Sequence, residues 1–150
     1  MSPRIAPLLI IAAGLAAYLN SFSGHFILDD GTAILANPNV RHLWPLSHAM
    51  SAPPWIEPLA QRPILSLSFA INFAISGLQV WSYHAVNLLI HLWAALLLYG
   101  IARRTFLEDP LRERCAASAV WLALGTSLLW TLHPLQTQSV TYITQRAESL

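Results

Sequence analysis

Three long apolar runs constrain this chain more than any other feature. They cover residues 5–22, 83–102 and 115–132, and none of them contains Asp, Glu, Lys or Arg. Each run is close to the length of about 20 residues that a helix needs to cross a bilayer. Charged residues make up only 10% of the chain, against roughly 25% in soluble domains. The sequence therefore predicts an all-α, polytopic membrane protein with about three transmembrane helices and further helices in its outer loops.

The charged residues and the cysteine exclude several classes of protein. The chain has eight arginines, no lysine and seven acidic residues, which gives a formal net charge of +1. This near balance argues against a nucleic-acid-binding protein, which needs a basic surface for phosphates. Cys115 is the single cysteine, which excludes an internal disulfide framework and a multi-cysteine metal site.

The first run has two interpretations. A single arginine, Arg4, precedes a short apolar run with small residues, which is compatible with a cleaved signal peptide. We favour an uncleaved span, because its basic region is thin and because Tyr18 and Phe22 suit an interfacial anchor.

The arginines predict the orientation in the membrane. Residues 103–114 contain four arginines, so this inner loop is expected to be cytoplasmic, with Arg4 on the same side. Residues 23–82 then form an outer loop, and residues 133–150 form an outer tail. We expect residues 1–150 to be the N-terminal part of a larger membrane domain, because the tail ends without a helix stop signal.

The outer loop divides at Arg62. Prolines interrupt any long helix before that residue, while Trp44 and Trp55 suit a loop at headgroup depth. Residues 63–77 predict a helix with proline in its first turn. This helix is too short to span, so we interpret it as an interfacial helix, with a buried re-entrant helix as the alternative. One polar stripe runs along it, formed by Ser68, Asn72 and Ser76.

Two adjacent carboxylates, Asp29 and Asp30, follow the first span and precede Gly31. Partial burial and mutual repulsion raise a carboxyl pKa, so such a pair can supply a general base or a ligand for a divalent cation. The tripeptide Asp-Asp-Gly is also common in ordinary turns, and the residues alone favour the interpretation as a turn.

His84, Asn87 and His91 share one face of the second span, at spacings i, i+3 and i+7. This face could form the polar wall of a substrate cavity. Hydrogen bonding between helices is at least as good an explanation, and the spacing of the two histidines does not indicate zinc.

The tail is expected to form a helix capped by Thr137, with Val140, Ile143, Ala147 and Leu150 as its apolar stripe. Its other face carries hydroxyls and amides but few charges, which favours the lining of a polar cavity over a solvated surface. Arginine offers a bidentate fork to phosphate, so Arg62 and Arg146 are candidate phosphate ligands. We assign Arg41 to an ordinary salt bridge.

Four blocks of sequence resemble a known family: residues 20–41, 62–69, 83–91 and 133–148. They include Asp29-Asp30, Arg62-Pro63, and His133-Pro134 with Arg146-Ala147-Glu148. The blocks resemble, in the same order, the transmembrane and tetratricopeptide-repeat proteins related to protein O-mannosyltransferases. That family belongs to the membrane-embedded GT-C class of glycosyltransferases. The resemblance implies that later spans and a repeat domain follow after Leu150.

The resemblance also implies a reaction. A carboxylate of the first outer loop, Asp29 or Asp30, would act as base in an inverting transfer of a mannose-like sugar from a polyprenyl-phosphate donor to a protein hydroxyl. We expect the following residues to bind substrate or phosphate: Arg62, His84, His133, Gln138, Arg146 and Glu148. Gln138 departs from the family, which often has Glu there. Some GT-C enzymes use a divalent cation, but the sequence assigns no metal ligand.

The expected partners are membrane lipid, the lipid-linked sugar and a protein acceptor, with no nucleic acid. The expected location is a bacterial inner membrane, with the Asp29-Asp30 loop on the extracytoplasmic side, and the lack of lysine suggests a GC-rich bacterial source. Two other functions stay open: a non-catalytic membrane anchor for a repeat domain that binds proteins, and a channel or transporter that uses the His84, Asn87 and His91 face.

Overall fold

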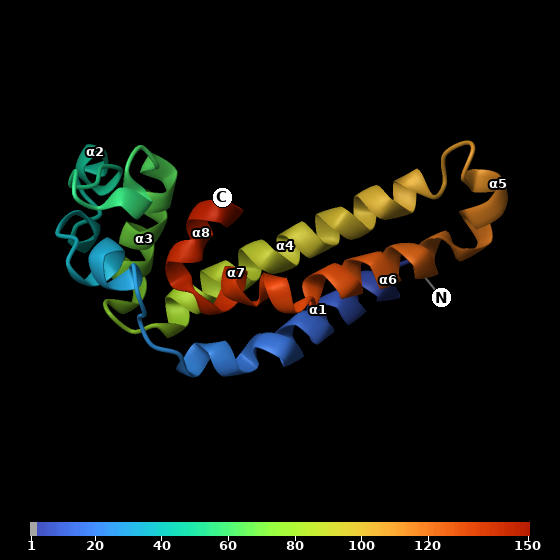
Figure 1. Ribbon diagram of the computed structural model, residues 1–150, viewed down its shortest axis with the longest axis horizontal. Coiled ribbons are helices and arrows are strands. Elements are labelled where there is room, and N and C mark those ends of the chain that lie inside the picture. The colour runs from blue at the N-terminus through green and yellow to red at the C-terminus, as the bar shows by residue number, and fades with distance from the viewer. Residues whose placement is uncertain (1–2) are drawn as a thin grey trace. The chain divides into compact units, whose positions relative to one another are not determined.

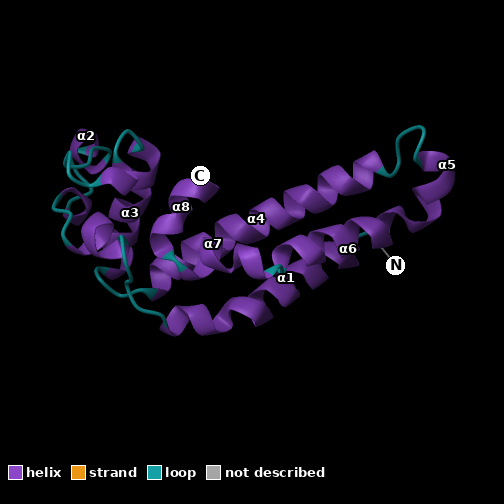
Figure 2. Cartoon of the chain, viewed as in Figure 1, coloured by secondary structure: helices purple, strands orange, loops and turns teal. Residues whose placement is uncertain are grey.

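The structure is a computed structural model that describes residues 3–150, and every regular element in that range is a helix. Figure 2 shows helices joined by short loops, with no strand in the part of the chain that is described. The expected all-α class is therefore confirmed. The chain divides into two compact units: residues 1–19 with 88–137, and residues 20–87 with 138–150. The helix α4 (Trp81–Thr105) contributes residues to both units.

The first unit contains the apolar helices. It holds α1 (Ile5–Tyr18), residues 88–105 of α4, the short α5 (Arg112–Cys115) and α6 (Ala119–Thr131). Figure 1 shows α1 and α6 side by side. The core shared by α1, α4 and α6 consists of Ala6, Ile10, Ala95, Tyr99, Ala123 and Leu124. A Cβ at Gly14 would lie 2.6 Å from Leu92 Cδ2, so the absence of a side chain at Gly14 allows this close packing.

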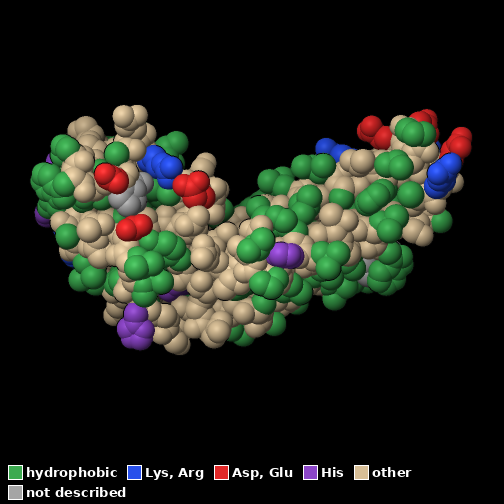
Figure 3. All heavy atoms as spheres, in the orientation of Figure 1, with side chains coloured by type: hydrophobic (Ala, Val, Ile, Leu, Met, Phe, Trp, Pro, Cys, Tyr) green, Lys and Arg blue, Asp and Glu red, His purple; other side chains and the backbone are tan. Residues whose placement is uncertain are grey.

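Two helical segments are long and apolar enough to cross a membrane, Ile5–Ser23 and Trp81–Thr105. They coincide with the first two expected spans. Arg112–Thr131 qualifies only together with Pro134–Thr141, to which it is joined at a bend of 55°. Figure 3 shows acidic and basic side chains gathered around α5, while hydrophobic side chains dominate the helices of this unit. Two or three apolar helices of this kind indicate association with a membrane.

Polar side chains inside the first unit bond to the backbone of neighbouring helices. A ring nitrogen of His91 lies 3.1 Å from the carbonyl oxygen of Thr131, and the Tyr18 hydroxyl donates to the same carbonyl at 3.0 Å. The His91 ring also stacks on Trp130 at 4.8 Å between centroids. Of the two interpretations of His91, the structure therefore shows hydrogen bonding between helices.

The second unit is built from short elements around α3 (Pro63–Ser76). They are η1 (Leu19–Ser23), η2 (Gly31–Leu35), η3 (Asn39–Arg41), α2 (Leu46–Ala49) and η4 (Glu57–Leu59), followed by the tail elements from residue 138 onward. The prolines before Arg62 keep these elements short, as expected. The core of the unit consists of Ala33, Ile34, Val40, Ile56, Leu59, Leu65, Phe69, Tyr83 and Ile143.

Helix α3 has the limits that its sequence predicts. Pro63 occupies its first turn, where the missing N–H is not needed, and Gly77 ends it with φ +59°. Its polar stripe faces protein rather than solvent. Ser76 Oγ lies 2.6 Å from Ser82 Oγ, and Asn72 Nδ2 donates to the Ser82 carbonyl at 3.0 Å.

The tail is not the single helix that its apolar stripe predicts. It forms η6 (Pro134–Gln136), α7 (Thr137–Thr141), η7 (Ile143–Gln145) and α8 (Arg146–Ser149). The helix breaks at Tyr142, whose backbone is extended at φ −106° and ψ 111°. Tertiary bonds replace the helical ones there: Asn87 Nδ2 donates to the carbonyls of Tyr142 and Ile143, and the Thr144 N–H donates to Asp30.

Candidate functional site

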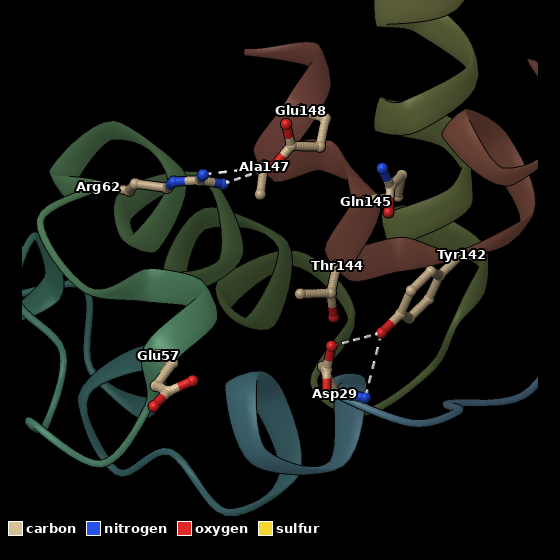
Figure 4. Close-up of a pocket in the computed structure, with 8 residues that line it drawn as sticks. All are labelled: Asp29, Glu57, Arg62, Tyr142, Thr144, Gln145, Ala147 and Glu148. Atoms are coloured by element: carbon tan, nitrogen blue, oxygen red, sulfur yellow. Dashed lines mark hydrogen bonds and ion pairs between the residues drawn. The ribbon is translucent and has the colours of Figure 1, made fainter.

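A cavity of about 360 Å³ lies entirely within the second unit. It is lined by Asp29, Glu57, Arg62, Tyr142, Thr144, Gln145, Ala147 and Glu148. Figure 4 shows these side chains coming from the first outer loop, from the segment around η4 and from the tail. The cavity thus joins three parts of the chain that are far apart in sequence. Three candidate residues, Asp29, Arg62 and Glu148, line it.

The two adjacent aspartates have opposite environments. Leu28, immediately before them, has φ +46°, a left-handed conformation that leucine rarely adopts. Asp29 is exposed and lines the cavity, whereas Asp30 is 0% exposed. The strained residue thus lies where the chain turns one carboxylate towards the cavity and the next into the interior. Such strain persists only where the surrounding structure holds it, and it often marks functional sites.

The Asp30 carboxylate joins the first outer loop to the tail. Its Oδ1 accepts the Thr144 N–H at 2.8 Å and also the Thr144 hydroxyl, while its Oδ2 accepts the Ile27 N–H at 3.1 Å. Both oxygens therefore have protein donors, as buried polar groups in folded proteins usually do. Asp30 is thus tied to protein donors in the interior and does not line the cavity, so of the two aspartates only Asp29 faces it.

The Asp29 carboxylate is held by a single side chain. The Tyr142 hydroxyl donates to Asp29 Oδ2 at 2.8 Å and accepts the backbone N–H of Asp29 at 3.3 Å. Burial, and next the hydrogen bond to Asp29, raise the pKa of Tyr142 above its ordinary value. The phenol is therefore protonated, and a donor, at neutral pH. Among the described residues, Asp29 Oδ1 accepts no hydrogen bond.

Arg62 faces the cavity from the start of α3. Its guanidinium contacts one oxygen of Glu148 at 3.2 and 3.3 Å. The side chains are 44% and 64% exposed, and an exposed pair of this kind contributes at most about 1 kcal/mol. An anion of higher charge density can therefore compete with Glu148 for Arg62 at little cost.

Arg146 lies in the interior, 0% exposed. It donates to the Asn87 and Asn72 side-chain oxygens at 2.7 Å each, to Ser68 Oγ at 3.1 Å and to the Tyr83 carbonyl at 2.9 Å. Burial lowers its pKa to about 9, against the opposing influence of Tyr83 and Asp30. Arg146 is thus still a cation at neutral pH, but protein acceptors occupy it and it does not line the cavity.

The remaining candidates lie outside the cavity lining. A ring nitrogen of His84 lies 3.0 Å from the Val140 carbonyl, and the residue is 1% exposed. Gln138 is exposed on α7. His133 belongs to the first unit, where its Nδ1 accepts the Leu135 N–H at 3.2 Å. Arg41 donates to the Leu35 carbonyl and lies over the Phe73 ring, so the salt bridge expected for it does not form among the described residues.

The sequence interpretation did not single out Glu57, Tyr142, Thr144 or Gln145. Three of them belong to the tail face of hydroxyls and amides that was expected to line a cavity. No sequence pattern of this kind marks Glu57 as a cavity residue, because it is a lone acid in a proline-rich loop. Within residues 3–150, no group of three His, Cys, Asp or Glu side chains is close enough to hold a metal ion.

A second, apolar groove of about 320 Å³ adjoins the cavity. It is lined by Arg62, Pro63, Ile64, Leu65, Ala147 and Leu150, and thus shares Arg62 and Ala147 with the cavity. Carboxylates suit the hydroxyls of a sugar, a guanidinium suits a phosphate, and an apolar groove suits a hydrocarbon chain. The two hollows therefore match a ligand with a polyol head, an anionic centre and an apolar tail.

Comparison with known proteins gives relatives named protein O-mannosyl-transferases. The chain is 34% identical over 151 residues to protein O-mannosyl-transferase TMTC2 of Mus musculus, covering 96% of this chain and 17% of that protein. It is 30% identical over 158 residues to protein O-mannosyl-transferase TMTC1 of Homo sapiens, covering 100% of this chain and 17% of that protein. A third relative is protein O-mannosyl-transferase F38B6.6 of Caenorhabditis elegans, at 29% over 150 residues, 95% of this chain and 21% of the relative.

No protein-family model matches the chain, and no solved structure matches it. The chain spans about a sixth of the length of the first two relatives, at 17% of each. Over nearly all of its own length, the chain is thus homologous to a segment of proteins named protein O-mannosyl-transferases.

Proposed function

We propose that the chain is the N-terminal portion of a membrane glycosyltransferase of the GT-C class, with the Asp29 cavity as part of its transfer site. The enzyme transfers a mannose-like sugar from a polyprenyl-phosphate donor to a protein hydroxyl. The observation that carries the proposal is the presence of Asp29 and Arg62 on the walls of one cavity. The names of the homologues support the type of reaction.

The adjoining apolar groove supports a lipid-linked donor. Arg62 belongs to both hollows. A phosphodiester bound there would place its sugar among the carboxylates of the cavity and its first isoprene units along Ile64, Leu65 and Leu150. Glu57 and Glu148 would accept hydrogen bonds from the sugar hydroxyls.

The proposed step is a direct displacement. Asp29 Oδ1 takes the proton of the acceptor hydroxyl as its oxygen bonds to the anomeric carbon. The bond from the anomeric carbon to the phosphate oxygen breaks, and the polyprenyl phosphate leaves with the electron pair. Arg62 stabilises the charge that develops on that phosphate. The use of a divalent cation stays a prediction from the resemblance.

The arginine pattern supports an orientation in which this unit lies outside the cytoplasm of a bacterial cell, with the N-terminus inside. Acceptor proteins would then meet the site on the extracytoplasmic face of the inner membrane. The tetratricopeptide-repeat domain is likewise part of the proposal.

The test is a transfer assay with the protein that carries this chain, purified in detergent and given a polyprenyl-phosphate mannose and a serine/threonine peptide. Asp29→Asn should lower the rate by about a hundredfold or more, because a positioned base contributes about 10² to 10⁴. The matched control is Asp109→Asn, an exposed aspartate outside the cavity.

Arg62→Gln should weaken donor binding, measured separately by titration with the polyprenyl phosphate. Wild-type rates in Asp29→Asn would overturn the assignment of the base. The absence of transfer in the wild-type protein, with binding of partner proteins retained, would favour the alternative of a non-catalytic membrane anchor.

A further inference from the structure

We propose that Tyr142 is the positioning residue of the transfer site, which holds Asp29 with one oxygen bound and the other presented to the acceptor. The inference rests on the proposed function and adds a residue to it. Tyr142 acts through Asp29 rather than on the sugar or the phosphate.

The contact between Tyr142 and Asp29 has two parts. The Tyr142 hydroxyl contacts Asp29 twice, as donor to Oδ2 at 2.8 Å and as acceptor from the backbone N–H at 3.3 Å. Figure 4 shows both bonds converging on the phenol oxygen. Two contacts to one residue fix both the backbone and the side-chain torsion of Asp29. A long flexible donor, such as lysine, would not impose this geometry.

One oxygen of the Asp29 carboxylate stays free. Oδ2 receives the phenol, whereas Oδ1 has no hydrogen-bond donor within the described range of the chain. A general base needs a lone pair within hydrogen-bond reach of the acceptor hydroxyl. Tyr142 therefore leaves one carboxylate oxygen, here Oδ1, free to receive the proton, and it holds the plane of the carboxylate in one orientation.

Tyr142 is itself held in place by hydrogen bonds. It lies at the break in the tail, with its carbonyl accepting from Asn87 Nδ2 at 3.3 Å. Asn87 Oδ1 in turn accepts from the buried Arg146 at 2.7 Å. Two residues further along, Thr144 binds Asp30. The tail segment 142–144 thus holds both aspartates, and the interior polar network of Arg146 fixes where the phenol can lie.

The experiment compares Tyr142→Phe with Tyr83→Phe in the same full-length protein. Tyr83 is the matched control, because its hydroxyl donates to the Gly77 carbonyl at 2.9 Å and it does not line the cavity. Tyr142→Phe should lower kcat about ten- to a hundredfold, since misplacement of a catalytic group by about 1 Å costs rates of that order. The KM for the donor and the melting temperature should stay within error of wild type.

Hydrogen–deuterium exchange supplies a readout that does not depend on activity. In Tyr142→Phe, peptides that contain the Asp29 amide should exchange faster, while Tyr83→Phe should leave them unchanged. Faster exchange together with a selective fall in kcat supports the inference.

Three results would overturn it. The first is unchanged hydrogen–deuterium exchange at the Asp29 amide in Tyr142→Phe, and the second is an unchanged kcat in that variant. The third is weaker donor binding together with a lower melting temperature, which is what the loss of a merely structural tyrosine would produce. Failure of the proposed function is distinguishable, because the wild-type protein would then show no transfer, or Asp29→Asn would transfer at the wild-type rate, whereas failure of this inference leaves both the wild-type activity and the loss in Asp29→Asn in place.

Discussion

At the scale of single residues, Asp29 and Asp30 show how neighbours in sequence take different roles. Asp30 accepts hydrogen bonds from the partly buried Ile27 N–H and from the buried Thr144 N–H, so its loss leaves these donors without partners. We expect Asp30→Asn to lower the free energy of unfolding by about 1–3 kcal/mol, because the new amide group would face the Ile27 N–H. Asp29→Asn, at an exposed site, should cost about 1 kcal/mol or less.

Thermal unfolding of both variants in detergent checks this difference. Equal melting temperatures for the two would contradict the assignment of Asp30 to structure. The sequence could not distinguish the two residues, because they share one local composition. Their environments are set by Thr144 and Tyr142, more than a hundred positions further along the chain.

Arg146 is the second residue whose environment defines its role. Asn72, Asn87 and the Tyr83 carbonyl accept from a planar group with fixed donor directions. An ammonium has three donors on one atom and cannot reach these separate acceptors. We therefore expect Arg146→Lys to lower the free energy of unfolding by about 3 kcal/mol or more. The variant would lose at least two hydrogen bonds from a charged donor, and each contributes about 1.5–3 kcal/mol.

The matched control is Arg62→Lys, where the partner Glu148 is exposed and the change should stay within about 1 kcal/mol. Chemical denaturation of both variants in detergent measures the difference. A tolerated lysine at position 146 would show that the guanidinium geometry is not required.

At the scale of elements, α3 is defined by its ends. Gly77 terminates it at φ +59° and ψ −122°, a conformation open almost only to glycine, and a Cβ there would touch nothing within 4 Å. The cost of Gly77→Ala is thus conformational, about 1–2 kcal/mol. Gly100→Ala is the control, because it lies inside α4 with open space around it and should stabilise by about 0.5–1 kcal/mol.

Opposite shifts in the melting temperature are the expected result, and a destabilised Gly100→Ala variant would contradict the argument. The comparison explains why α3 could be predicted from sequence: its signals, Pro63 and Gly77, lie within the element itself. The break at Tyr142 could not be predicted in this way. The local pattern there favours helix, and the bonds that interrupt it come from Asn87 and Asp30.

At the scale of the whole molecule, the unequal distribution of arginines predicts the topology. Cys115, the single cysteine, follows the arginine-rich segment, whereas Ser23 is exposed after the first span. In intact cells, a membrane-impermeant maleimide should label Ser23→Cys in a Cys115→Ser background. The native Cys115 should react only after permeabilisation, because the positive loop is retained inside. If Cys115 were labelled in intact cells and Ser23→Cys only after permeabilisation, the orientation would be the opposite of the predicted one.

The bond between Thr144 and Asp30 also sets an order of events during synthesis. It joins residues 114 positions apart, a stretch that a ribosome translates in roughly 6 to 23 seconds at about 5–20 residues per second. During that interval the Asp30 carboxylate keeps its water, and the cavity wall from Tyr142 to Glu148 does not yet exist. A nascent chain that stops before Thr144 can insert its apolar helices, but it leaves Asp30 without the donors that hold it in the interior.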